Sequence, residues 1–193
     1  MTARTGLTSL ILQLRGMADA GASEYTLGTA VFWDDNHVQD VLDRHRMDVV
    51  HEWLNPIVQY DAAGATSYHE YRSQYGDFEA TTGGTSIFVI QDSLGNNYGT
   101  ATYTPDYSRG IVTFSANNMG SAAYLIGRCY DLRSAAAEIW RTKAGQTAKL
   151  FNFSTDGHSL SREQYFEHCI RMVDFWESRA GATVTEVLRG DEV

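Results

Sequence analysis

The chain contains few cysteines, few basic residues and no long hydrophobic run. Its only cysteines are Cys129 and Cys169 in a sequence of 193 residues. Two isolated cysteines in a protein of the cytosol are typical of buried thiols that pack like small apolar groups. We therefore expect two free thiols, with a disulfide between them as the alternative. Neither cysteine lies in a cysteine–histidine cluster with the spacing of a zinc site.

No hydrophobic run is long enough to span a bilayer. The segment from Leu7 to Leu14 is interrupted by Thr8, Ser9 and Gln13. A signal peptide would need a longer uninterrupted apolar stretch and a cleavage site made of small residues. The sequence therefore predicts a protein that is made in the cytoplasm and has no membrane partner.

Basic residues are outnumbered, with 15 Lys and Arg against 24 Asp and Glu, so the net charge is -9 at pH 7. Tight binding to nucleic acid needs clustered Lys and Arg, because the release of phosphate counterions supplies much of the affinity. The composition therefore disfavours tight binding to DNA. Acidity primarily indicates solubility, and it is also compatible with a channel wall along which DNA slides without sticking.

The common catalytic motifs are also missing. The chain has no phosphate-binding loop, no dinucleotide-binding glycine pattern, no Gly-x-Ser-x-Gly elbow and no His-Glu-x-x-His. Asp156-Gly157-His158-Ser159 contains the residue types of a hydrolytic triad. Sequence neighbours seldom converge as nucleophile, base and orienting group, so we interpret this segment as a turn before a helix. The sequence predicts no catalytic, cofactor-binding or metal-binding residues, and hence no enzyme.

A second candidate cluster places two histidines among four aspartates: His37, His45, Asp34, Asp35, Asp40 and Asp43. A helical metal site would space its two histidines four residues apart, and these two do not have that spacing. We interpret the cluster as a solvated helix face whose aspartates cap the helix. The glycosylation pattern Asn152-Phe153-Ser154 is attributed to chance, because no secretory signal accompanies it.

Hydrophobic spacing predicts helices at both ends of the chain. Apolar residues at three- and four-residue steps predict a first helix that begins at Leu7 and ends at Gly21, and a second helix from Asp35 to about Arg46. Asp131 is expected to cap a third helix, with Ala135, Ala136, Ile139, Trp140, Lys143, Ala144 and Thr147 on one broad face. A capping box at Ser161 is expected to begin a fourth helix that ends at Gly181. Its apolar residues recur at three- and four-residue steps: Tyr165, Cys169, Met172, Val173 and Trp176.

Between the helical stretches, short hydrophobic runs alternate with turn residues. We expect strands over 49–60, 67–72, 85–90, 98–103, 111–114 and 122–130, arranged as an antiparallel meander. The predicted fold class is α+β. It is a helical bundle scaffold, made of N-terminal helices plus a C-terminal helical hairpin, with an inserted antiparallel β region over 48–128 and an extended C-terminal tail over 182–193. We treat residues 1–193 as a single domain.

Aromatic residues gather in one part of the β region, at Tyr68, Tyr71, Tyr75 and Phe78. Two interpretations stay open for them. The cluster packs the core of the sheet, or it anchors a protein interface, since Tyr binds with little loss of conformational entropy.

The C-terminal third carries a specific order of motifs. Ala135–Trp140 and Lys143-Ala144 form an alanine-rich helix, and Phe151–Arg162 contains an aromatic-Ser-x-Asp-Gly turn that leads to a Ser-Arg helix start. This order resembles that of the head-to-tail connector proteins, or adaptors, of tailed bacteriophages.

Earlier parts of the chain are similar to the same family. They are Phe32–Asp35, Val41–Arg46 and the hairpin Asp106–Phe114. The β stretch from 49 to 127 departs from the family pattern because it is longer than in compact, mostly helical adaptors. Its contacts stay open between the capsid, the portal clip, a neighbouring subunit and a tail protein.

The resemblance implies a structural virion protein of the neck, assembled in the host cytoplasm and free of catalytic residues and cofactors. Its copies would form a homo-oligomeric ring, typically of twelve, that docks beneath the portal protein. Genome DNA would pass through the channel without sequence-specific binding, and tail, stopper or other neck proteins would bind below. The tail over 183–193 would dock against the portal or a neighbouring adaptor by adding a strand or filling a groove.

Three alternatives accompany this reading. The chain is another phage neck protein, such as a stopper or tail terminator, although helices at both ends argue against these mostly β-barrel proteins. It is a small hydrolase that uses His158 or the histidines of the second helix. Or it is an unrelated interaction module of the host, in which case its gene would not lie beside portal and capsid genes.

Overall fold

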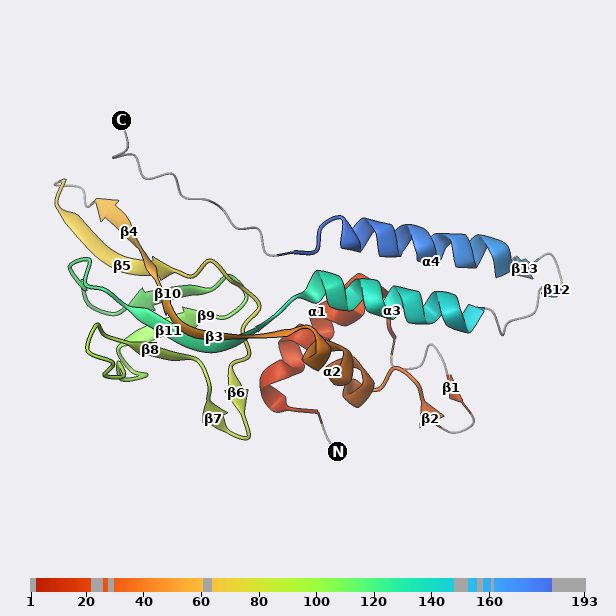
Figure 1. The fold of residues 1–193 in the computed structure, drawn as a ribbon, viewed down its shortest axis with the longest axis horizontal. Helices are drawn as coiled ribbons and strands as arrows, with labels where there is room; N and C mark the ends of the chain where they lie inside the picture. Colours follow the sequence, from red (N-terminus) through yellow and green to blue (C-terminus); the bar gives the residue numbers. More distant parts are fainter. Residues whose placement is uncertain are drawn as a thin grey trace. The chain divides into compact units, whose positions relative to one another are not determined.

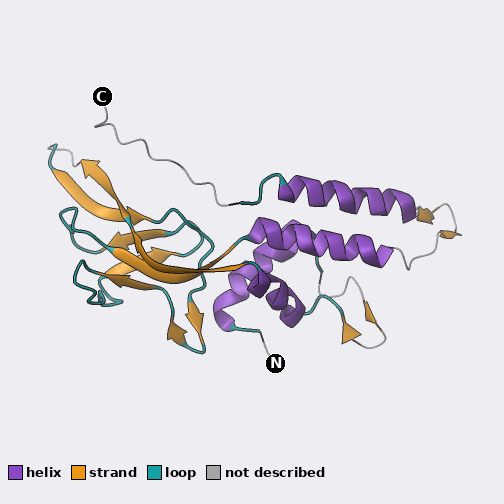
Figure 2. Ribbon diagram, viewed as in Figure 1, coloured by secondary structure: helices purple, strands orange, loops and turns teal. Residues whose placement is uncertain are grey.

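The chain folds into two compact units in a computed structural model that describes residues 3–21, 26–27, 30–60, 64–147, 153–155, 158–160 and 162–181. A helical unit contains the residues up to Met47, Thr81–Gly84 and Tyr130–Gly181, and a β unit contains residues 48–80 and 85–129. Four helices and two larger antiparallel sheets make the described part α+β, which confirms the predicted class (Figure 2). Residues 182–193, where the extended tail was expected, lie outside the described residues. The prediction of a single adaptor domain stays a prediction.

The helical unit consists of one short 3-10 helix, four α-helices and short strands (Figure 1). The helices are η1 (Thr5–Leu7), α1 (Thr8–Ala18), α2 (Asp35–Arg44), α3 (Leu132–Thr147) and α4 (Arg162–Glu177). The strands form two antiparallel pairs, β1 (Thr26–Leu27) with β2 (Ala30–Val31) and β12 (Phe153–Thr155) with β13 (His158–Leu160), and β6 (Thr81–Thr82) also belongs to this unit.

The predicted buried faces of the two long C-terminal helices are confirmed. Every residue assigned to the broad face of α3 is buried, and Cys169 and Val173 of α4 lie in the same core. Asp131 caps α3, because its Oδ1 accepts hydrogen bonds from the backbone N–H groups of Arg133 and Ser134. The 3.6-residue period of the sequence was thus sufficient to identify these faces.

Helix ends differ from the predicted positions. Helix α1 ends at Ala18 rather than Gly21, because Asp19 adopts the left-handed conformation (φ 48°), which Asp tolerates better than most residues. Helix α2 ends at Arg44, and α4 ends at Glu177, before Gly181. In both, hydrogen bonds to the residue three positions back tighten the end of the helix, from His45 to Leu42 and from Ala180 to Glu177.

Side chains of α3 satisfy the carbonyl groups at the end of α1. The Trp140 indole N–H donates to the Met17 carbonyl over 3.2 Å, and Lys143 Nζ donates to the Asp19 carbonyl over 2.6 Å. Lys143 is buried, and its ammonium lies 4.7 Å from the centroid of the Trp140 ring. A cation at the C-terminal end of a helix is stabilised by the helix dipole, so these contacts attach α1 to α3.

The β unit contains two antiparallel sheets. One has the order β4-β5-β10-β9 and the other the order β3-β11-β8. Their strands are β3 (Arg46–Trp53), β4 (Asn55–Tyr60), β5 (Thr66–Arg72), β8 (Val89–Gln91), β9 (Tyr103–Asp106), β10 (Ile111–Phe114) and β11 (Tyr124–Tyr130), and β7 (Thr85–Ser86) is a short addition.

The predicted meander is wrong, and three of its expected strands differ from the structure, one of them because 85–90 is divided into β7 and β8. The expected strand over 49–60 is divided into β3 and β4 at Leu54, which is fully buried and from which the chain enters the other sheet. In the expected strand over 98–103 only Tyr103 is in a strand, where it begins β9. Since β5 pairs with β10 and β11 lies between β3 and β8, the pairing is mostly non-local, which local alternation does not reveal.

The close approach of η1 to β6 gives a stability test. A Cβ at Gly6 would overlap the Thr81 carbonyl oxygen, whereas a Cβ at Gly16 in α1 would have no neighbour within 4 Å. We expect Gly6→Ala to lower the free energy of unfolding by about 1–3 kcal/mol because backbone must move. Gly16→Ala should raise it by about 0.5–1 kcal/mol because Ala favours the helix. Urea denaturation measures both, and equal stability of the two variants would contradict the packing of η1.

Candidate interaction surface

The histidines of α2 have separate carboxylate partners rather than a common site. His37 Nδ1 lies 3.1 Å from Asp34 Oδ1, which also accepts the backbone N–H of His37 and thereby caps α2. His45 Nε2 lies 2.7 Å from Glu138 Oε2 on α3. The interpretation as a solvated, capped helix face is confirmed for Asp34. Within the described residues, no group of three or more His, Cys, Asp or Glu side chains is placed to hold a metal ion.

Glu138 connects α3 to the end of α2. Its carboxylate accepts a hydrogen bond from Arg44 Nε over 2.8 Å and pairs with His45. Burial alone would raise the pKa of Glu138, but the hydrogen bonds from Arg44 and His45 lower it below its ordinary value. A carboxyl group whose pKa is lower in the folded state stabilises the fold above its unfolded pKa, and this stabilisation is lost as the pH falls through the folded pKa.

Replacement of Glu138 tests this linkage. We expect Glu138→Gln to lower the free energy of unfolding by about 1 kcal/mol at neutral pH, because Arg44 and His45 lose a charged acceptor. The difference from the unmodified chain should shrink as the pH falls below 4.5, the ordinary value for this group. Glu167→Gln on α4 is the control, since its partner Arg171 is exposed. Urea titrations across the pH range measure this, and a difference that does not depend on pH would contradict it.

The triad-like segment is only partly described. His158 and Ser159 belong to β13, where they pair with Thr155 and Ser154 of β12. Asp156 and Gly157 lie outside the described residues, as do Asn152 of the glycosylation pattern and Ser161 of the predicted capping box.

The cysteines are free and buried, which confirms the expectation of two thiols. Burial raises the pKa of Cys129 to about 12. A thiol with so high a pKa is protonated at neutral pH and is a poor nucleophile.

The aromatic cluster of the β region belongs to the core. Tyr71 and Phe78 are buried, and Tyr68 and Tyr75 pack partly buried against the same cluster. The Tyr71 ring meets Phe114 edge-on at 5.2 Å between centroids. Of the two interpretations left open, core packing is confirmed.

The β unit has a charge-poor surface that sequence analysis missed. From Ala80 to Gly127 the only charged residues are Asp92, Asp106 and Arg109, although 20% of the whole chain is charged. The segment from Trp53 to Tyr60 has none. Protein interfaces are depleted of charge at their centre and use Tyr, Ser, Gly and Asn for adaptable contacts. The distribution of charge along the chain was the signal that could have revealed this surface.

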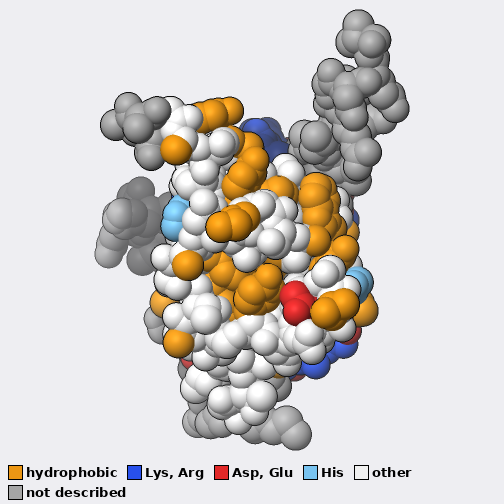
Figure 3. Space-filling view, turned by 90° about the vertical axis from the view of Figure 1, so that its left-hand side faces the viewer, with side chains coloured by type: hydrophobic (Ala, Val, Ile, Leu, Met, Phe, Trp, Pro, Cys, Tyr) orange, Lys and Arg blue, Asp and Glu red, His pale blue; other side chains and the backbone are white. Residues whose placement is uncertain are grey.

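Large apolar side chains are exposed on the same unit: Val50 and Trp53 on β3, Val58 and Tyr60 on β4, and Leu94 and Met119 in turns. Leu94 is 84% exposed and Met119 is 82% exposed. Figure 3 shows a face on which hydrophobic side chains gather with few charged ones among them. Large exposed apolar groups that lie together are typical of a protein-binding surface.

Hydrogen bonds hold both turns in a defined shape. The Asp92 carboxylate accepts the backbone N–H groups of Leu94 and Asn96. Asn117 Oδ1 accepts the N–H of Met119 over 3.0 Å and that of Tyr68 over 2.9 Å. Each apolar tip therefore projects from a turn that is already ordered, so binding through it costs little conformational entropy.

Three of the four outer strands of the two sheets of the β unit have features that oppose strand addition. Strand β4 has Pro56 and a register irregularity between Ile57 and Gln59. Strand β9 contains Pro105, and in β3 the residue His51 has a positive φ of 57°. Proline and bulges are the usual protection of edge strands. We therefore expect the β unit to bind a partner through its side chains rather than through backbone pairing at its sheet edges.

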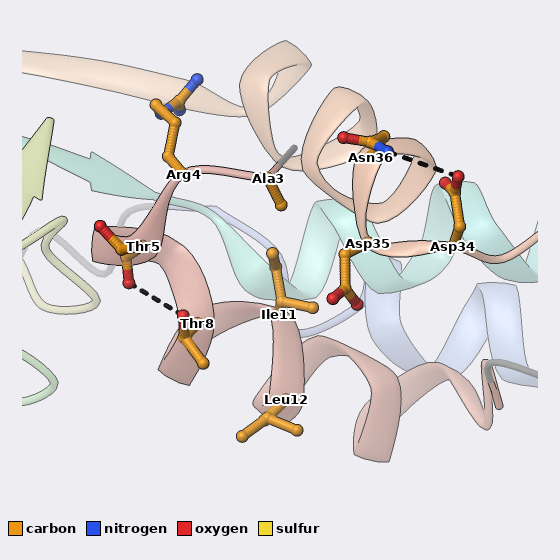
Figure 4. A pocket seen from close by; sticks show the side chains of 9 residues that line it. All are labelled: Ala3, Arg4, Thr5, Thr8, Ile11, Leu12, Asp34, Asp35 and Asn36. Atoms are coloured by element: carbon orange, nitrogen blue, oxygen red, sulfur yellow. Dashed lines mark hydrogen bonds between the residues drawn. The ribbon is translucent and has the colours of Figure 1, made fainter. Parts of the chain in front are cut away.

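The helical unit has a hollow of about 460 Å³ beside the start of α1. Figure 4 shows its lining: Ala3, Arg4, Thr5, Thr8, Ile11, Leu12, Asp34, Asp35 and Asn36. Ile11 is buried, whereas Leu12 is 64% exposed. Arg4 pairs with Asp43, and Asp35 pairs with Arg15 over 2.8 Å. The hollow thus combines apolar side chains of α1 with carboxylates at the beginning of α2.

No protein-family model matches the chain, and no curated protein matches it. In the part of the chain that the structure describes, no helix is both long and apolar enough to cross a membrane. The surfaces described above are therefore the observations on which a function is proposed.

Proposed function

We propose that this chain is a structural virion protein of a tailed bacteriophage, the connector that forms a ring between the portal and the tail. Twelve copies would enclose a channel through which genome DNA passes without sequence-specific binding. Tail, stopper or other neck proteins would dock below the ring. In this proposal the chain has no catalytic role and needs no cofactor.

The order of motifs in the sequence supports the assignment to the neck, and the packing of the last two helices is compatible with it. Arg133 of α3 donates to the Arg179 carbonyl beyond the end of α4, and the Trp140 ring meets His168 edge-on at 5.4 Å. The start of α3 thus contacts the residues just after α4, and a later position of α3 contacts an earlier position of α4, as in an antiparallel pair. We therefore propose the finer fold, a helical bundle scaffold with a C-terminal helical hairpin, as part of the connector.

The charge-poor surface of the β unit is the single observation that carries a role in assembly. The chain has a net charge of -9, so copies repel one another over most of their surface. Association is favourable where charge is absent and apolar side chains are exposed, and this unit offers such a face. An assembly protein needs a face of this kind, whereas a catalyst that works as a monomer does not.

Cryo-electron microscopy tests the proposal. The chain would be purified and mixed with the portal protein of the same phage. We expect ring-shaped density beneath the portal, and sedimentation should show a complex much larger than the 21.5 kDa chain. Absence of portal binding, or location of the chain elsewhere in a virion, would overturn the proposal.

The C-terminal residues give a second test. We expect deletion of residues 182–193 to abolish docking to the portal, because an extended tail binds by adding a strand or filling a groove. The melting temperature should stay close to that of the full chain. A variant in which the same residues are shuffled is the control for sequence specificity. Docking by the truncated chain as tight as that of the full chain would refute the role of the tail.

A further inference from the structure

His51 adds a side chain to the outer face of the β3-β11-β8 sheet. Successive side chains of a regular strand point to opposite faces, yet Val50 and His51 are both exposed after the buried Val49. His51 has a positive φ of 57°, and such a residue within a strand re-aims its side chain as a bulge does. The imidazole ring lies flat on the Tyr124 ring of β11, with 4.2 Å between centroids and 2° between planes. An uncommon backbone conformation that produces a defined ring stack indicates a functional role.

Two amide side chains continue this row on the other side of Tyr124. Gln91 of β8 is the register partner of Tyr124, and the next pair, Leu125 with Ile90, is fully buried in the core. Because successive pairs face opposite sides of a sheet, Tyr124 and Gln91 face away from the core. Gln91 Nε2 donates a hydrogen bond to Asn97 Oδ1 over 3.0 Å. A row of two rings and two amides therefore crosses the sheet from β3 to the turn after β8.

The amide pair keeps one acceptor and one donor group for a ligand. In the part of the chain that the structure describes, the Gln91 amide oxygen accepts no hydrogen bond and the Asn97 amide nitrogen donates none. Two neighbouring hydroxyl groups of a sugar match such a pair, because one can donate to the oxygen while the other accepts from the nitrogen. The C–H groups on one face of a hexose are apolar and pack on aromatic rings, whose faces carry partial negative charge.

The charged neighbours of this row are already paired. Asp48 of β3 pairs with Arg128 of β11 over 3.4 Å. Glu52 accepts hydrogen bonds from the segment after β5, and Asp92 accepts them from the backbone of its own turn. Nucleic acids and acidic polysaccharides require clustered Lys or Arg, which this row does not offer. Rings that alternate with open amide groups suit hydroxyl groups better than the apolar anchor of a protein partner.

We propose that the outer face of the β3-β11-β8 sheet binds a glycan made of uncharged sugars. The sugar rings pack on His51 and on Trp53, which is 52% exposed and faces away from the core because the next residue, Leu54, is fully buried. Sugar hydroxyl groups bind the amides of Gln91 and Asn97. This inference goes beyond the proposed function and does not depend on it, because the site lies within the β unit of one copy.

Calorimetric titration of the full chain tests the site. The probes are short uncharged oligosaccharides of glucose, of mannose, of galactose and of N-acetylglucosamine. We expect at least one to bind with a Kd on the order of 0.1–1 mM, because a flat site makes few contacts. Oligogalacturonate is the matched control for oligogalactose, since it adds a carboxylate to each ring. It should bind at least about tenfold more weakly than the best uncharged probe, because the chain has a net charge of -9.

Variants of the ring positions locate the binding. His51→Asn keeps a residue that tolerates positive φ and removes the stacked ring. We expect His51→Asn and Trp53→Ala each to raise the Kd about tenfold. Tyr60→Ala is the control and should leave the Kd unchanged, because Tyr60 is 74% exposed but belongs to the other sheet. Circular dichroism would establish that all three variants are folded.

Each outcome decides the inference. Binding of none of the uncharged probes would overturn it, and so would binding that the His51 and Trp53 variants leave unchanged, or oligogalacturonate binding as tight as that of the best uncharged probe. If no glycan binds while His51→Asn weakens self-association or portal binding, the face is a protein contact and the inference is wrong. Glycan binding by a chain that does not bind the portal would overturn the proposed function alone.

Discussion

The helical unit depends on the buried contact between α3 and the end of α1. Lys143 carries its charge into the core, where the Asp19 carbonyl and the face of Trp140 replace water. Arg15 extends this connection, because its guanidinium donates to the carbonyls of Ala20 and Trp33. A buried cation is stable only where such partners surround it. Arg15 thus connects the end of α1 with the residues that precede α2.

The β unit obeys a different constraint, which is electrostatic. An acidic chain can associate with acidic copies only through surfaces that lack charge. The stretch from Ala80 to Gly127 provides such a surface, while proline and bulges on the free edges prevent indiscriminate strand addition. Exposed apolar groups then act through side chains on ordered turns. This combination permits specific assembly and limits aggregation, which an open hydrophobic edge would promote.

Local signals in the sequence predicted the local structure well. The buried face of α3 follows from helical spacing, and the caps at Asp34 and Asp131 follow from carboxylates that precede helices. The local hairpin at Asp106–Phe114 was expected and is formed by β9 and β10, but the pairing of β5 with β10 was not predictable, because it joins residues far apart in the sequence. The contact between His45 and Glu138 was not predictable for the same reason, because Glu138 lies on α3, far from His45 in the sequence. The candidate surface was partly predictable from its lack of charge, but the hydrogen bonds that hold its turns in a defined conformation were not.

The central claim is that the charge-poor face of the β unit is an assembly surface. Hydrogen–deuterium exchange, compared between the isolated chain and the assembled form, tests it most directly. Peptides that cover 115–121 and 53–60 should lose exchange on assembly, because their backbone becomes shielded from solvent. The claim would be contradicted if these peptides exchanged at the same rate in both states while protection appeared only elsewhere in the chain.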